Sequence, residues 1–224
     1  EILIYSYVDI IKFNGSIIES DDSCIFLNHK NWKKIQVLLK LLKNTLWISK
    51  VSRRVMIFKK ISGEFRPLTV LSFFDKIVAM AMKIVLNFIY EKEKDLDILP
   101  NERYFHNVSH GVRFKRGCHS ALNKLLSWGL FSWVIQSKIN KCYDTINQKR
   151  LISIIKESIE DQRMIDSTFK FFNAPTIKTE KGELGNWQGV GVLQENSLNF
   201  LLVNIYLNEF DWFVINLEKE IVKG

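Results

Sequence analysis

The stretch RRVMIFKKISGEFRPLTVL, residues 53–71, decides the fold class that the sequence predicts. β-Branched and aromatic residues alternate loosely over residues 53–58, Ser62-Gly63 supplies a turn, and a second apolar run starts at Phe65. This arrangement predicts a β-hairpin. Cations are spread along it and give the hairpin a basic rim: Arg53, Arg54, Lys59 and Arg66.

Helical patterns surround the hairpin. Apolar residues recur every three or four positions over residues 31–49 and 75–91, which predicts an amphipathic helix on each side of it. In the first of these helices the lysines fall mostly on the open side: Lys33, Lys34, Lys40 and Lys43.

The second half of the chain is also mostly helical in pattern. Pro175 ends one of its helices, because proline disfavours helical geometry at the residue before it. An order of helices interrupted by local hairpins predicts an α+β fold and not an alternating parallel one. The expected elements are a helix over residues 119–128, a strand over 133–139, a long helix over 150–172, a hairpin or loop over 176–191 and a helix over 198–215.

The charge of the chain is concentrated in its middle. Of a net charge of +8 on 224 residues, segments 1–50, 51–150 and 151–224 contribute +2, +10 and −4. Such a basic segment attracts polyanions, and counterion release from phosphates makes nucleic acid its natural partner. The alternative is a lysine-rich solvated surface produced by A/T-rich codons. Against it, five of the eight arginines lie in two short stretches: Arg53, Arg54, Arg66, Arg113 and Arg116.

Composition excludes several classes of protein. With 47% hydrophobic and 25% charged residues the chain is not disordered. Its longest apolar run, residues 79–90, is interrupted by a lysine and an asparagine, so we expect no membrane span. The cysteines form no CxxC pair, which predicts neither disulfides nor a zinc site and favours a reducing compartment: Cys24, Cys118 and Cys142.

A second basic stretch, SHGVRFKRGCHSA over residues 109–121, supports a physical prediction of its own. Gly111 and Gly117 flank three cations, and a loop of this kind can bring them against a phosphate backbone. Arginine offers two parallel donors to phosphate oxygens. We therefore expect phosphate contacts from Arg113, Lys115 and Arg116, together with Arg53, Arg54, Lys59 and Arg66 of the hairpin.

Five stretches, in the same order, resemble the fingers and palm of group II intron reverse transcriptases, or maturases. Residues 57–68 are similar to I-P-K…G-x-x-R-P-L, and residues 109–121 to S-x-G-F-R-P-x-R-x-x-H-x-A, with Val112 and Phe114 departing from its Phe and Pro. The other three stretches are residues 75–91, 133–146 and 191–211. The resemblance covers most of the chain and implies a right-hand polymerase fold.

The resemblance also implies a division into three parts. Residues 1–50 are expected to form an N-terminal helical extension, residues 51–130 a fingers-like basic region, and residues 131–224 a partial palm-like region. The Tyr-Ala-Asp-Asp hairpin, the thumb and the maturase domain of the family are expected to be lacking.

By the same resemblance, the polymerase chemistry has decayed. Active relatives use Mg²⁺ held by aspartates, but Lys138 stands at the first of these positions, and an ammonium group has no lone pair for a metal. Asp144 and Asp211 could substitute, yet they lack a defined hairpin partner. We expect no catalytic residue, metal or cofactor in this chain, and only a remnant of the nucleotide pocket: Lys59, Arg66, Lys138 and Gln194.

The predicted function is to bind intron RNA and assist splicing, as an organellar maturase-like protein derived from a reverse transcriptase that has lost catalysis. The alternatives are a fragment of an active RNA-directed DNA polymerase and a helical scaffold whose basic surface reflects codon bias. Residues with A/T-rich codons favour an organelle, with the chloroplast preferred over the mitochondrion. No membrane contact is expected, and no protein partner can be inferred.

Overall fold

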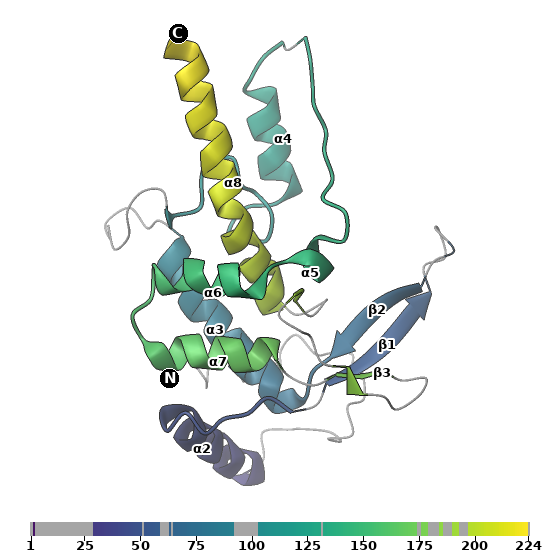
Figure 1. Ribbon diagram of the computed structural model, residues 1–224, viewed down its shortest axis with the longest axis vertical. Coiled ribbons are helices and arrows are strands. Elements are labelled where there is room, and N and C mark those ends of the chain that lie inside the picture. Colours follow the sequence, from purple (N-terminus) through teal and green to yellow (C-terminus); the bar gives the residue numbers. More distant parts are fainter. Residues whose placement is uncertain are drawn as a thin grey trace.

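The computed structural model describes residues 2, 29–50, 52–58, 63, 65–91, 103–130, 132–173, 176–178, 184–185, 190–192 and 197–223. Figure 1 shows how the elements within these residues are arranged. In chain order they are α2 (His29–Lys43), β1 (Ser52–Phe58), β2 (Phe65–Val70), α3 (Phe73–Tyr90), α4 (Cys118–Leu126), α5 (Cys142–Thr145), α6 (Gln148–Lys156), α7 (Gln162–Phe172), β3 (Thr176–Lys178), β4 (Leu184–Gly185) and α8 (Ser197–Lys223).

The strands form one sheet in the order β2-β1-β3-β4. β1 and β2 pair antiparallel, with Ile57 opposite Arg66, which confirms the predicted hairpin. Near its turn the rings of Phe58 and Phe65 lie 5.3 Å apart. β3 pairs in parallel with β1 and antiparallel with β4. The region 176–191 therefore adds its short strands to the same sheet as the hairpin.

Side-chain caps define where several helices begin. Ser72 Oγ accepts a hydrogen bond of 3.2 Å from the backbone N–H of Asp75 at the start of α3. Asn147 and Asp161 cap α6 and α7 in the same way. Each cap satisfies a backbone donor that the first turn of a helix leaves unpaired.

Two of the predicted elements were wrong. The expected long helix over residues 150–172 is two helices, because Asp161 starts a new helix after the turn that follows Lys156. Residues 133–139, expected as a strand, form an irregular and exposed segment. None of the described strands pairs with this segment, and a strand needs a neighbouring backbone to complete its hydrogen bonds.

The hydrophobic core lies among α3, α6, α7 and α8. α8 packs against α3 and α6, while α6 packs against α7; in Figure 1 the sheet lies to one side of this helical group. A smaller cluster of Ile35, Phe73 and Ile77 joins α2 to α3. Among the described helices, none combines the length and the apolarity needed to cross a membrane. The fully buried side chains of the main core include Leu86, Leu151, Ile155, Phe171, Leu201 and Leu202.

The segment from residue 103 to residue 117 is tied to α3 and α8. The backbone N–H of Phe105 donates to the carbonyl oxygen of Tyr90, the last residue of α3, at 3.1 Å. Trp212 of α8 donates from Nε1 to the carbonyl oxygen of Tyr104 at 2.9 Å. Tyr104 and Phe105 are both buried. The basic loop, defined as residues 109–117, therefore follows a firmly held stretch of chain.

We expect Leu202→Ala to lower the free energy of unfolding by about 2–5 kcal/mol, because it deletes a fully buried side chain and leaves a cavity. Leu217→Ala is the matched control on the same helix, since Leu217 is 44% exposed; it should change the value by less than about 0.5 kcal/mol. Equilibrium urea unfolding measures both. Equal effects of the two substitutions would contradict the core described above.

Candidate nucleic-acid interface

Arg113 is the most firmly bound cation of the basic loop. Its side chain is only 4% exposed. Nε and Nη2 donate to the two carboxylate oxygens of Glu91 at 2.9 and 2.7 Å, and Nη1 donates to the carbonyl oxygens of His106 and Ser109 at 2.7 and 2.9 Å. The guanidinium carbon lies 5.2 Å from the ring centroid of Phe105.

This geometry argues against the phosphate contact that the sequence predicts for Arg113. A guanidinium has five N–H donors, and the contacts to Glu91, His106 and Ser109 occupy most of them. Burial separates the group from any external phosphate. Arg113 instead fastens the basic loop to the residue that follows α3, a partner 22 positions away in sequence.

Arg116 and Lys115 are placed closer to solvent. Arg116 donates from Nη1 to the carbonyl oxygen of Asn107 at 2.7 Å and from Nη2 to its Oδ1 at 3.0 Å. Lys115 is exposed, and its Nζ lies 5.3 Å from the ring centroid of Phe114. Phe114 is itself 74% exposed. The loop therefore presents an ammonium group and an aromatic ring together at its tip.

The backbone of the basic loop is in an unusual conformation. Val112 and Lys115 have φ values of 54° and 56°, in the left-handed region that costs a non-glycine residue about 1–3 kcal/mol. The hydrogen bonds of Arg113 offset this cost, and so does a hydrogen bond from Asn204 Nδ2 on α8 to the carbonyl oxygen of Gly111.

The pKa values of two histidines beside the loop are lowered. Burial lowers the pKa of His110, and the nearby charges of Arg116, Arg113 and Lys124 lower it further. The pKa of His106 is lowered by burial and then by cations that again include Arg113. Nearby cations therefore add to the effect of burial on both imidazoles, although the charge of Arg113 is itself balanced by Glu91.

The hairpin cations are only partly described. Arg53 and Arg54 lie in β1 and Arg66 lies in β2, but their side chains are outside the described part of the structure, as is the whole of Lys59. Gln194 also lies outside the described residues. The phosphate and nucleotide contacts expected of these residues remain predictions.

Three residues considered for the expected polymerase site lie in the described part of the chain. Lys138 lies in the exposed segment 132–140, Asp144 lies on α5 and Asp211 on α8. Burial raises the pKa of Asp211, and the charge of Arg113 opposes that rise. Within the described ranges, no group of three or more His, Cys, Asp or Glu side chains gathers as a metal site would require.

α2 adds further basic surface. Lys33, Lys34, Lys40 and Lys43 are exposed, as its pattern predicts, while Ile35 and Leu38 are buried. Lys34 Nζ lies 5.9 Å from the ring centroid of Phe74. A cavity of about 410 Å³ between α2 and α3 has Lys33, Lys34 and Lys50 among its lining residues.

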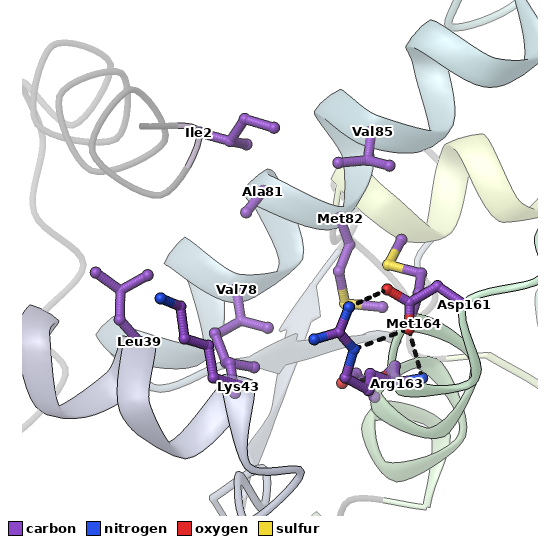
Figure 2. Close-up of a pocket in the computed structure, with 12 residues that line it drawn as sticks. Ile2, Leu39, Lys43, Val78, Ala81, Met82, Val85, Asp161, Arg163 and Met164 are labelled. Carbon is purple, nitrogen blue, oxygen red and sulfur yellow. Dashed lines mark hydrogen bonds and ion pairs between the residues drawn. The ribbon is translucent and has the colours of Figure 1, made fainter.

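A larger cavity, of about 650 Å³, lies among α2, α3 and α7 (Figure 2). Its lining is largely apolar and includes Leu39, Val78 and Met82. At one edge Arg163 Nη2 and Asp161 Oδ2 pair at 2.8 Å. Lys43 and Ser167 also line it, but the described contacts do not show these polar groups converging on one point as a small-ligand site requires, and we assign no site to it.

Comparison with known proteins identifies relatives of one kind. No protein-family model matches the chain. Group II intron-encoded protein LtrA of Lactococcus lactis subsp. cremoris is 35% identical over 191 residues, 83% of this chain and 29% of that protein. The 91 kDa protein in the cob intron of Schizosaccharomyces pombe is 34% identical over 187 residues, 83% of this chain and 21% of that protein. Nuclear intron maturase 4, mitochondrial, of Arabidopsis thaliana is 31% identical over 139 residues, 61% and 16% of the two chains. The chain thus spans less than a third of the length of these relatives.

A solved structure supports the fold. One chain of the partial Cas6-RT-Cas1–Cas2 complex superposes with a TM-score of 0.56 and 17% identity, over 96% of this chain and 34% of that chain. The described fold is therefore a reverse-transcriptase-like α+β fold, as the sequence predicts. Within that class the homologues of this chain are group II intron-encoded proteins and intron maturases, at 28–35% identity.

We expect Arg113→Ala to lower the free energy of unfolding by about 3 kcal/mol, because it leaves the largely buried carboxylate of Glu91 without its partner. Arg163→Ala is the matched control: its pair with Asp161 is exposed, with side chains 60% and 48% accessible, and should contribute less than about 1 kcal/mol. Urea unfolding compares the two variants. If Arg113→Ala cost no more than Arg163→Ala, Arg113 would not be the anchor of the loop.

Proposed function

We propose that the protein binds intron RNA and assists intron splicing, as a maturase. The observation that carries this proposal is the tip of the basic loop, where Lys115 and Arg116 lie on an anchored backbone surrounded by further positive charge. Homology to proteins named as group II intron-encoded proteins and intron maturases supports it. The RNA partner is an inference for this chain, which spans only part of its relatives.

Binding would be mainly electrostatic. Lys115 and Arg116 would contact phosphates, and the exposed lysines of α2 would form a second basic surface near the start of α3: Lys33, Lys34, Lys40 and Lys43. Each neutralised phosphate releases counterions, so affinity falls as salt rises. Arg53, Arg54, Lys59 and Arg66 are further proposed phosphate contacts on the hairpin.

The proposed action does not include polymerisation by this chain. Lys138, at the position where the family motif has its first metal-binding aspartate, carries a charge that repels Mg²⁺. The structure describes Lys138 as an exposed residue in an irregular segment. A protein of this kind would keep the reverse-transcriptase scaffold and use it to hold RNA.

The setting we propose is an organelle. One relative is encoded in a cob intron and another is named as mitochondrial, and this supports an organellar protein. These names do not favour the chloroplast over the mitochondrion, so the preference for the chloroplast that residue usage raised has no support from the relatives.

Replacing Lys115 and Arg116 by alanine together should weaken binding to a structured intron RNA by roughly tenfold per lost phosphate contact at about 100 mM salt, and should lower the salt slope by roughly one per contact. Filter binding over a range of salt concentrations measures both quantities. The control removes two exposed cations of α6, Lys149 and Lys156. The same loss in both double variants would mean that net charge, and not the basic loop, determines binding.

We expect the protein to give no Mg²⁺-dependent extension of a labelled DNA primer on an RNA template, because Lys138 removes a metal ligand. A verified reverse transcriptase on the same template serves as the positive control. Extended products from this protein would favour the alternative of an RNA-directed DNA polymerase. RNA retention without extension agrees with the proposed role.

A further inference from the structure

We propose that Phe114 is a stacking platform for an unpaired base of the bound RNA, so that the protein prefers RNA with a bulged or single-stranded nucleotide to a fully paired helix. This inference rests on the proposed function, because it names the feature of the RNA that the basic loop recognises. The motif that the loop resembles has proline at this position, so the aromatic ring is a departure of this chain from that motif.

The first argument is the pairing of groups at the loop tip. A single exposed apolar side chain is ordinary on a protein surface, but Phe114 is 74% exposed beside an ammonium group only 5.3 Å from its ring centroid. An unpaired nucleotide has the matching pair of features, a flat base and a phosphate. Aromatic side chains that stack on bases next to cations that bind phosphates are the usual composition of single-strand binding sites.

The second argument is that the tip is held in place before RNA arrives. The residue before Phe114 is the buried Arg113, bonded to Glu91, His106 and Ser109. Arg116, two residues after it, is bonded to Asn107. Because both flanks are fixed, stacking on Phe114 costs less ordering of the backbone than stacking on a side chain in a flexible loop.

The third argument is the strained backbone on either side of the ring. Val112 and Lys115 both have positive φ, and the chain between them directs Arg113 inward while Phe114 and Lys115 stay exposed. A backbone with negative φ at both positions would be free of this strain. Strain of this kind persists where the surrounding contacts enforce it, and it is concentrated at ligand-binding positions.

The charge around the tip favours an anionic ligand over a neutral apolar one. Lys115 is exposed beside the ring, and Arg116 and Lys124 contribute to lowering the pKa of His110, whereas the charge of Arg113 is balanced by Glu91. An apolar protein surface would have to bury Lys115 to reach Phe114, at a cost in desolvation. RNA instead neutralises this charge as its base reaches the ring.

The test uses two RNA hairpins that differ only in one bulged 2-aminopurine. Phe114→Ala should weaken binding to the bulged hairpin by roughly 5- to 150-fold, the effect of losing one aromatic–base stack. It should leave the affinity for the paired hairpin, and the salt slope on both, unchanged. Wild-type protein should also quench the 2-aminopurine fluorescence, which Phe114→Ala should not do. Phe114→Trp should retain both the preference and the quenching.

The matched control is Phe169→Ala on α7, since Phe169 is also an exposed phenylalanine, at 52%; it should match wild type on both RNAs. Unchanged binding of the bulged hairpin by Phe114→Ala would overturn the inference while RNA binding itself stands. An equal loss on both hairpins would also overturn it, because Phe114 would then support the loop and not a base. If wild-type protein bound neither hairpin, the proposed function would fail first.

Discussion

The described structure depends on how one buried charge is satisfied. Arg113 lies inside the protein, where an unpaired guanidinium would be very costly, and Glu91 together with two carbonyl groups accepts its hydrogen bonds. These bonds hold residues 106–113 against Glu91 at the end of α3. They also enforce left-handed conformations at Val112 and Lys115, which no local preference would select. The shape of the exposed loop tip is thus a consequence of an internal ion pair.

The helical core makes that ion pair possible. Glu91, the partner of Arg113, is the C-cap residue of α3. Asn208 and Trp212 of α8 form hydrogen bonds with His106 and Tyr104, which precede the basic loop. The same helices bury Leu201 and Leu202 against α3. A reverse-transcriptase-like scaffold can therefore keep its packing while Lys138 stands where the family motif has an aspartate, because the core and the exposed cations are different residues. Retention of the core residues does not require retention of that aspartate.

Much of the fold was predictable because its patterns are local. Apolar spacing located α2, α3, α4 and α8, and the turn at Ser62-Gly63 located the β1–β2 hairpin. Each of these patterns is contained within one stretch of chain. The errors have a common cause. A strand over residues 133–139 depends on a partner that its own residues do not specify, and the break between α6 and α7 depends on the cap at Asp161, which periodicity does not detect.

The candidate site likewise has features that the sequence predicts and features that only the folded chain decides. Composition and motif order were sufficient to indicate a basic relative of intron maturases, because charge and residue order are properties of the chain itself. They were insufficient to separate Arg113 from Lys115 and Arg116, which are nearly adjacent in sequence. Only the folded chain distinguishes them, since it brings Glu91 and the carbonyl groups of the preceding turn around one guanidinium and leaves Lys115 in solvent. Which cation is structural depends on contacts across 22 positions, and no local pattern encodes such a distance.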